Sequence, residues 1–105
     1  MRQAFVKFLE ATTITGLEYE DSRQNYKGRS GLLRIQDGPN GKVACDFFTL
    51  DSKGHVSRIA PSSGQLVETD IEITVRTSHS IYKFSKSYNL TNEEQESLFQ
   101  EVELR

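Results

Sequence analysis

The clearest pattern in the chain is an alternation of apolar and polar positions over residues 70–76. Its apolar members are Ile71, Ile73 and Val75. A period of two predicts a strand with one face buried and the other in water. Residues 80–84 follow closely, and Tyr82 and Phe84 share a face there. Residues 77–79 fit a tight connection, so we expect these two strands to pair.

A longer run over residues 42–50 (KVACDFFTL) has apolar side chains on both of its faces. A strand buried on both faces has this composition, so we expect it in the interior of a sheet. Residues 31–36 and 55–60 would flank it as a three-strand meander. Turn signals rich in Gly, Pro, Asp and Ser separate these runs at residues 38–41, 51–54 and 61–64.

The N-terminal residues 2–14 fit two structures. Phe5, Phe8 and Leu9 belong to a helical stripe, whereas Val6 and Phe8 alternate as in a strand. The TTIT sequence that follows is β-branched, and such residues lose side-chain freedom in a helix. We therefore expect a strand here, with a helix as the alternative.

The C-terminal segment predicts a helix that begins at Thr91. The side chain of Thr91 can cap the first turn, and Glu94 three residues later completes a capping box. Leu98 and Val102 share one face, with Phe99 beside them. This helix therefore has an apolar surface to lay on the sheet.

Together these elements predict a single domain of the α+β class over residues 1–105. We expect five or six short, mainly antiparallel strands that form a meander or a small barrel, with one C-terminal α-helix. The 105 residues suffice for one such core, because domains commonly contain about 100–150 residues.

Cysteine content and hydropathy narrow the class of protein. Cys45 is the only cysteine, which excludes a disulfide within the chain and a zinc site built on several cysteines. The N-terminal sequence MRQAFVKFLEATT lacks an apolar run of signal-peptide length. No stretch approaches the roughly 20 apolar residues that span a bilayer. We therefore expect a cytoplasmic protein with no membrane partner.

Charge is distributed unevenly, although the net charge is only −2. Residues 22–36 are basic and contain no acid, and their cations are Arg23, Lys27, Arg29 and Arg34. Residues 91–105 are acidic and contain one base, Arg105, and their anions are Glu93, Glu94, Glu96, Glu101 and Glu103. The net charge gives the whole molecule no electrostatic preference for nucleic acid.

Candidate catalytic groups are few. Cys45 with His55 or His79 could form a nucleophile and a base. However, a cysteine in the middle of a central strand is typically a small buried hydrophobe. The histidines are far apart, and the aspartates lack the spacing of a calcium loop. We predict no catalytic residue, no metal site and no cofactor.

Two polar segments are candidate anion sites or partner contacts, and their residues are Tyr26, Lys27, Arg29, Arg34, Arg76 and His79. The first four lie in the basic segment, where a tyrosine ring can stack and two glycines let backbone amides turn toward an anion. The last two lie around a turn that places several donors close together. The alternatives are a solvated loop and a polar hairpin tip.

The acidic helix is a second candidate surface. Its glutamates could contact a basic partner, and the residues concerned are Glu93, Glu94, Glu96 and Glu101. A solvated helix face is the alternative explanation.

Thr77, Ser80, Tyr82 and Phe84 lie in the stretch ITVRTSHSIYKF, residues 73–84. This stretch resembles a pattern of small proteins from bacteriophages and mobile elements, in which a strand reading V-x-T precedes x-S-x-Y-x-F on the next strand. The resemblance implies a binding role, such as inhibition of a host defence or regulatory factor. It implies no catalytic residue.

Our first hypothesis is therefore a small non-catalytic binding protein, encoded by a phage or mobile element, that inhibits a host protein or sequesters a small anionic ligand. The alternative is a small barrel that binds single-stranded nucleic acid through Tyr26, Lys27, Arg29 and Arg34. An enzyme is the least favoured class. Edge strands that pair between copies would produce a homo-oligomer.

Overall fold

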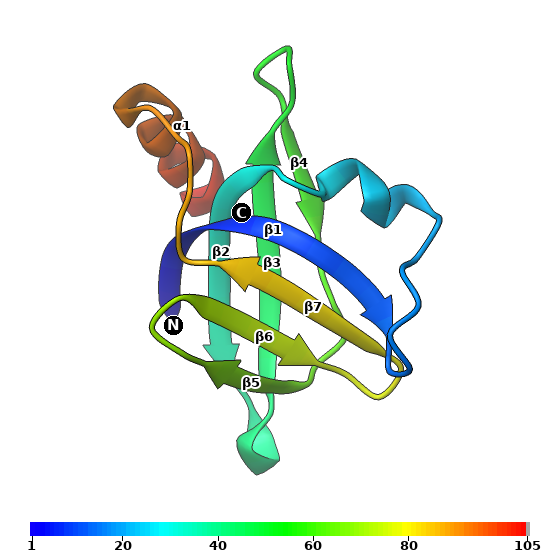
Figure 1. Ribbon diagram of the computed structural model, residues 1–105. Coiled ribbons are helices and arrows are strands. Elements are labelled where there is room, and N and C mark those ends of the chain that lie inside the picture. Colours follow the sequence, from blue (N-terminus) through cyan, green and yellow to red (C-terminus); the bar gives the residue numbers. More distant parts are fainter. Residues whose placement is uncertain (105) are drawn as a thin grey trace.

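Seven antiparallel strands form one sheet in the order β4-β3-β2-β1-β7-β6-β5, and one helix follows them (Figure 1). The computed structural model describes residues 1–104, and Arg105 lies outside the described part. The strands are β1 (Arg2–Thr13), β2 (Ser30–Asp37), β3 (Val43–Leu50), β4 (Val56–Ile59), β5 (Gln65–Glu68), β6 (Glu72–Arg76) and β7 (Ser80–Ser85). The helices are the 3-10 turns η1 (Ser22–Tyr26) and η2 (Pro39–Gly41) and the α-helix α1 (Asn92–Glu103).

The first strand lies at the centre of the sheet and joins its two halves. Its N-terminal half pairs with β2, from Arg2 opposite Ile35 to Lys7 opposite Ser30. Its C-terminal half pairs with β7, and the register shifts between Phe8 and Glu10. Such a bulge bends a strand and increases its twist. The bend lets the half formed by β2, β3 and β4 curl over the half formed by β5, β6 and β7.

Apolar side chains from both halves fill the concave side of this curl. Phe8 is fully buried at its centre, and its ring lies 5.7 Å from that of Phe47 and 5.4 Å from that of Phe84, measured between centroids. Tilted and edge-to-face rings at these separations are favourable beyond the area that they bury. Residues 2–13 form the strand β1, and Val6 points to the same side as Phe8, as the alternation in the sequence predicts. The strand is confirmed and the helix is wrong.

The two edge strands, β4 and β5, do not pair, so the sheet does not close and the barrel alternative is wrong. The two halves of the sheet also meet where β3 begins, opposite the segment before β5. There the amides of Val43 and Gly64 each donate to the carbonyl of the other, at 2.7 and 3.0 Å. On its other side Gly64 lies so close to β6 that a side chain would not fit, because a Cβ there would lie 2.3 Å from the carbonyl oxygen of Arg76.

The strand boundaries agree with the sequence in most places. The meander β2-β3-β4 is confirmed, with each predicted end within one residue of the observed end. The sheet has seven strands rather than five or six because β5 was missed. That strand has only four residues and turns one apolar side chain, Leu66, toward the core. Such a short, mostly exposed strand leaves almost no alternation to detect.

One predicted core residue is exposed. Ile71 continues the alternation of Ile73 and Val75, but its side chain is 70% exposed while theirs are fully buried. The chain turns at this point. The Thr69 hydroxyl accepts a hydrogen bond from the Glu72 amide, and the Thr69 amide donates one to the Glu72 carbonyl. The strand therefore begins at Glu72, and Ile71 belongs to the turn.

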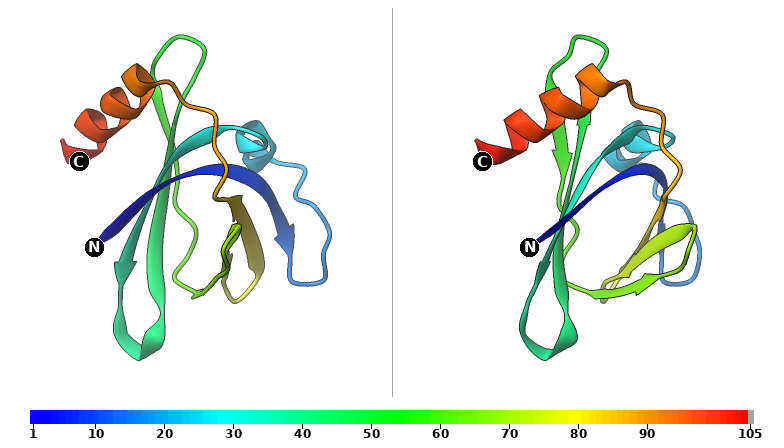
Figure 2. Two further views of the ribbon diagram at one scale, coloured as in Figure 1. Left: turned by 60° about the vertical axis from the view of Figure 1, so that its left-hand side comes forward. Right: turned by 90° about the vertical axis from the view of Figure 1, so that its left-hand side faces the viewer.

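The helix α1 packs outside the curl, on the convex side of β2 and β3 (Figure 2). Leu98 and Val102 are buried against Leu32 and Phe48. The predicted capping box of Thr91 is present, because its hydroxyl accepts the Glu94 amide while the Glu94 carboxylate accepts its amide. The α+β class, the mainly antiparallel sheet and the single C-terminal helix are therefore confirmed.

Candidate functional site

Most cations of the basic segment are neutralised by nearby acids. Lys27 forms an ion pair with Glu18, and Arg23 forms one with Asp21 at 2.7 Å. Hydrogen bonding to Lys27 lowers the pKa of Glu18, as expected for a carboxylate beside a cation. Arg29 alone among the cations of this segment has no ion pair within the described residues. The segment therefore presents far less free positive charge than its sequence suggests.

Arg34 lies apart from the others, on the convex face of the sheet. Its guanidinium is 3.2 Å from the carboxylate of Asp46, which also binds Arg58 from the neighbouring strand. The same guanidinium lies 5.2 Å from the centroid of the Phe48 ring. Arg34 is thus a cross-strand structural residue, and the structure separates it from Tyr26, Lys27 and Arg29.

The ring of Tyr26 faces inward. It packs against Phe8 and Phe47, and its hydroxyl donates to the carbonyl of Arg58 at 2.8 Å. Burial raises the pKa of Tyr26. The part of the ring that packs against Phe8 and Phe47 is not available to stack on a nucleic-acid base, which weakens the support for the single-stranded nucleic-acid alternative.

The backbone amides predicted to face an anion are already used. The amides of Lys27, Gly28 and Arg29 donate to the carbonyls of Gln24, Phe8 and Tyr26 respectively. An anion-binding concavity needs amides that point into solvent. Around residues 27–29 the backbone therefore serves the fold, attaching the connection between β1 and β2 to the β1 strand.

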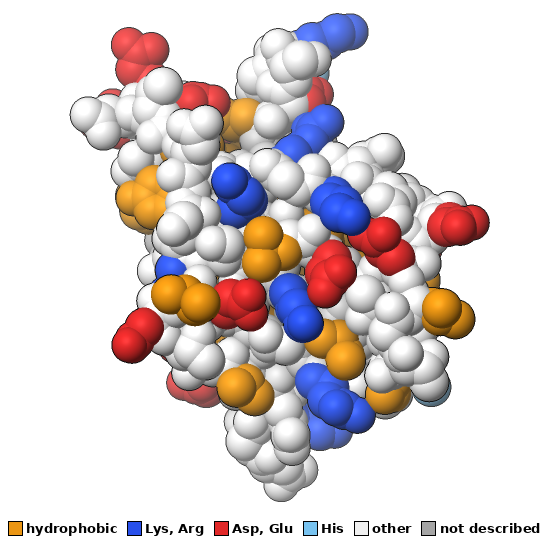
Figure 3. All heavy atoms as spheres, viewed as in Figure 1, with side chains coloured by type: hydrophobic (Ala, Val, Ile, Leu, Met, Phe, Trp, Pro, Cys, Tyr) orange, Lys and Arg blue, Asp and Glu red, His pale blue; other side chains and the backbone are white. Residues whose placement is uncertain are grey.

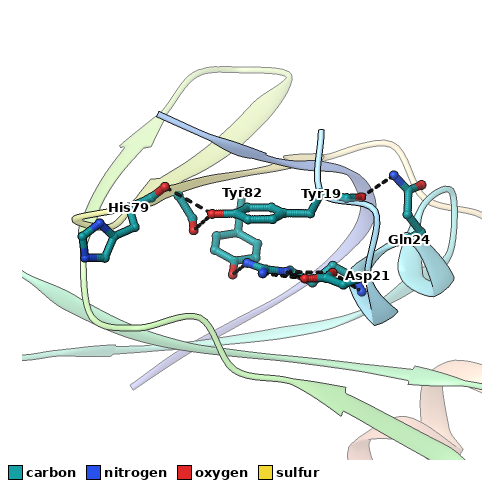
Figure 4. Close-up of polar contacts among 7 residues, drawn as sticks. Tyr19, Asp21, Gln24, His79 and Tyr82 are labelled. Atoms are coloured by element: carbon teal, nitrogen blue, oxygen red, sulfur yellow. Dashed lines mark hydrogen bonds and ion pairs between the residues drawn. The ribbon is translucent and has the colours of Figure 1, made fainter. Parts of the chain in front are cut away.

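A polar network closes the open end of the curl beside this connection (Figure 4). The guanidinium of Arg23 lies 3.4 Å from the centroid of the Tyr19 ring and donates to the hydroxyl of Tyr82 at 3.1 Å. Asp21 holds the other side of the guanidinium, and this hydrogen bonding raises the pKa of Arg23. The Tyr19 hydroxyl lies 2.6 Å from that of Ser80. The sequence carried no signal for this network, whose partners are about 60 positions apart.

The four residues of the phage-like motif all have structural positions. Phe84 and Tyr82 are in the core, and Ser80 belongs to the polar network. The hydroxyl of Thr77 accepts the amide of Ser80 at 3.0 Å and so holds the β6–β7 turn. Packing and turn formation thus account for the motif without a site. The link to phages stays a prediction.

The structure also separates Arg76 from His79. The His79 imidazole is exposed and points away from the polar network, to which the residue contributes only its carbonyl (Figure 4). Arg76 ends β6 and lines a hollow of about 250 Å³ together with Lys42, Ser63 and Ser78. Sequence reasoning did not connect Lys42 with this place, because it lies on another strand connection far along the chain.

The acidic helix carries an exposed aromatic cluster beside it, formed by Phe5, Tyr88 and Phe99. The Phe5 ring lies 5.5 Å from that of Tyr88 and 4.9 Å from that of Phe99, between centroids. Tyr88 is 43% exposed and Phe99 is 39% exposed. Large aromatic side chains that gather at the surface mark interaction sites more often than scattered apolar residues do.

Helix geometry sorts the glutamates around this cluster. Glu96 and Glu103 lie three residues before and four residues after Phe99, so they border it on the same side of the helix. Glu93 and Glu101 point elsewhere, since each residue turns by about 100° around the axis. Glu94 caps the helix through the Thr91 amide. None of these side chains forms an ion pair with a cation within residues 1–104.

The charged side chains on the other faces are largely mixed. Figure 3 shows acidic, basic and hydrophobic side chains interspersed over the face formed by β1, β7 and β6. Ion pairs such as that between Lys83 and Glu10 account for part of this pattern. A mixed surface of this kind is typical of a solvated face.

The candidate catalytic groups lie apart. Cys45 is 3% exposed, and burial raises the pKa of its thiol to about 11, which opposes formation of a nucleophilic thiolate. His55 is exposed on the β3–β4 turn beside Asp51, on the far side of the molecule from the polar hairpin that carries His79. Within the part of the chain that the structure describes, no three His, Cys, Asp or Glu side chains are grouped to hold a metal ion.

No family model, curated protein or solved structure matches the chain. The class of protein is therefore inferred from the fold and the surfaces. Among the described helices, none has the length and apolar character needed to cross a membrane. The fold and surfaces define a small α+β domain with a filled core, a partly exposed aromatic cluster beside the helix and a hollow lined by Lys42 and Arg76.

Proposed function

We propose that this protein is a small non-catalytic binding protein that docks on a basic surface of a protein partner. The docking surface consists of the aromatic cluster, Phe5, Tyr88 and Phe99, with Glu96 and Glu103 on its border. The observation that carries the proposal is the position of these three rings beside carboxylates that no cation of the described chain neutralises.

The rings supply the apolar centre of such an interface. Interfaces concentrate their binding energy in a few aromatic or arginine side chains at the centre, surrounded by a polar rim. Phe5 is held by the β1 strand and Phe99 by the capped helix α1, so two of the rings sit on rigid elements. A preorganised surface loses less entropy when it binds.

Charge favours a basic partner. Glu96 and Glu103 lie on the helix side of the cluster, whereas Lys7, two positions after Phe5 on the same face of β1, lies on the strand side. The partner should therefore place its own cations over α1. The same acidic helix opposes the docking of a second copy on this surface, because two acidic helices would repel each other.

The resemblance to small bacteriophage proteins supports a host protein as the partner, with inhibition as the consequence of occupying its basic surface. The proposal places this event in the cytoplasm, where a single reduced cysteine is the ordinary state. Basic surfaces that bind nucleic acid are one class of target that an acidic helix can occupy.

A capture experiment with matched variants tests the proposal. Tagged wild-type protein is incubated with host lysate, and the retained proteins are identified by mass spectrometry. We expect a basic protein that is retained by the wild type and lost with Tyr88→Ala. The double variant Glu96→Gln/Glu103→Gln should weaken retention several-fold and reduce its dependence on salt.

The same helix supplies the control. Glu93→Gln/Glu101→Gln removes two charges from α1 but leaves the border of the aromatic cluster intact. It should retain the partner as well as the wild type does. Equal retention by all four proteins, or equal loss in both double variants, would contradict docking at this surface.

A further inference from the structure

A hollow of about 250 Å³ lies between the end of β6 and residues 63–64, which precede β5. Its lining combines two cations with hydroxyl and amide side chains, from Lys42, Ser63, Gln65, Arg76, Thr77 and Ser78. Figure 3 shows basic side chains gathered on this part of the surface, with no acidic side chain among them. The lining contains no carboxylate, whereas the adjoining hollow contains Asp37.

Both cations are unpaired in the described part of the chain. Seven of the twelve Lys and Arg side chains within residues 1–104 form an ion pair with a carboxylate, as Lys86 and Arg2 do with Glu68. Lys42, in the connection before β3, and Arg76, at the end of β6, have no such partner within the described residues, and both line the same hollow. Two like charges that are brought together without an acid repel each other, and an anion between them relieves that repulsion.

The local backbone explains how this lining forms. Gly64 lets the chain pass so close to β6 that Ser63 lies beside the end of that strand. The amide of Gly64 is used by the Val43 carbonyl, which fixes the segment against β3 beside Lys42. The hydroxyls of Ser63 and Ser78 form no hydrogen bond within residues 1–104, so both remain available to a ligand.

We infer that this hollow binds the phosphate group of a small organic phosphate. A phosphate presents several strong acceptor oxygens, which match a guanidinium, an ammonium and two hydroxyl donors. Binding sites for small molecules commonly combine a few such polar groups with an apolar wall. The inference is independent of the protein-docking surface, which lies on the helix side of the molecule.

An adjoining hollow offers room for the organic part of the ligand. Its volume is about 420 Å³, and it shares Lys42 and Ser63 with the first hollow. Its lining includes the apolar residues Pro39, Val43 and Ala44, together with Asp37. A phosphate held by the two cations would therefore direct its ester group over the β2–β3 turn.

NMR titration of the full chain tests this site, with phenyl phosphate and inorganic phosphate as probes. At pH 7.5 phenyl phosphate is mainly a dianion, since the second pKa of a phosphate monoester is about 6, whereas inorganic phosphate is a mixture of its monoanion and dianion. We expect saturable shifts of the amide signals of Gln65, Thr77 and Ser78 with both probes. Phenyl phosphate should bind several-fold more tightly and should also shift the Ala44 signal.

Matched charge variants decide which cations are responsible. Lys42→Gln and Arg76→Gln should each weaken the binding of phenyl phosphate at least fivefold, and both side chains are exposed, so the fold should persist. Lys53→Gln removes a lysine that has no ion pair within residues 1–104, from the β3–β4 turn at the other end of β3, and should leave the affinity unchanged. Absence of saturation, or an equal effect of all three variants, would overturn the site. Equal affinities for the two probes would overturn the role of the second hollow.

Discussion

Phe99 on α1 packs edge-on against Phe5 on β1, with the ring centroids 4.9 Å apart and an angle of 72° between the ring planes. This contact lies at the border of the buried helix–sheet interface, where part of the Phe99 ring is exposed to solvent. It therefore has two consequences, one for stability and one for recognition. The recognition role is the proposed docking surface, and the stability role can be measured separately.

Replacing Phe99 by Ala should lower the free energy of unfolding by about 1–2 kcal/mol. The variant loses both the edge-to-face contact and the buried part of the ring. Urea denaturation followed by circular dichroism measures the change. Gln100→Ala, at an exposed neighbouring position, should change stability by less than about 0.5 kcal/mol, and an equal loss in both variants would contradict the packing role of Phe99.

Gly31 allows β2 to approach β3, so Gly31→Ala should destabilise the protein by about 3 kcal/mol. A Cβ at this position would lie 2.1 Å from the carbonyl oxygen of Phe48 and 2.9 Å from the Phe47 ring. Neither group can move without disturbing the sheet or the core. Gly38→Ala is the control, because its Cβ would lie 3.3 Å from its nearest neighbour. Denaturant midpoints for the two variants should differ clearly, and similar midpoints would argue against the close approach.

Tyr19→Phe removes one hydroxyl from the polar network and should cost about 1–2 kcal/mol. The Ser80 hydroxyl, 2.6 Å away on a residue that is 6% exposed, would lose its partner in a place that water barely reaches. Tyr88→Phe removes a hydroxyl that is exposed and should leave the melting temperature unchanged. A thermal melt in which both variants behave alike would show that the network adds no stability.

Glu68 connects the end of β5 to Arg2 and Lys86, and these cations lower its pKa to about 2, mainly through the hydrogen bonds to Arg2. A glutamate in an unfolded chain titrates near pH 4.3. Because the folded pKa is the lower one, the ion pairs stabilise the fold above about pH 4.3 and lose this effect as the pH falls through about 2.

Glu68→Gln should therefore lower the free energy of unfolding at pH 7 by about 0.5–1 kcal/mol, the range for exposed ion pairs. The difference from the wild type should shrink below about pH 4 and vanish only when the pH falls below about 2, the folded pKa. Denaturation curves at several pH values measure it, and 1 M salt at pH 7 should reduce it as well. A difference that keeps its full size as the pH falls to about 2 would mean that Glu68 acts through packing instead.

Cys45 should react slowly with a thiol reagent at pH 8 as long as the protein is folded. The side chain is 3% exposed and the pKa of its thiol is raised to about 11. We expect a rate at least about 100-fold below that of the protein unfolded in urea, since reaction requires an exposed thiolate. Comparable rates in the two states would place Cys45 at an accessible position and reopen a chemical role for it.

Local patterns were sufficient for most of the secondary structure. The capping box at Thr91 and Glu94 and the alternation of Ile73 and Val75 involve residues within four positions of one another, so their meaning does not depend on distant contacts. The same reasoning failed at Ile71, because a turn stabilised by Thr69 interrupts an alternation that continues in the sequence.

The candidate site was less predictable, because whether a charged side chain is free to bind a ligand depends on which side chains lie beside it in the fold. From the sequence, Lys27 and Arg34 were predicted to be free cations, but each has a carboxylate beside it in the fold. Tyr26 was predicted to offer its ring for stacking, but the ring packs against Phe8. Burial and pairing of these side chains depend on strands that approach each other only after the sheet curls.

By itself, then, the sequence determined the strands around the core, the capped acidic helix and the absence of an internal disulfide, since each follows from neighbouring residues or from composition. Only the tertiary structure decided which charges remain unpaired and which rings reach the surface. It left Lys42 and Arg76 together at one hollow and Phe5 beside Phe99. The physical reason is the bend of β1, which brings together segments that are far apart in the chain.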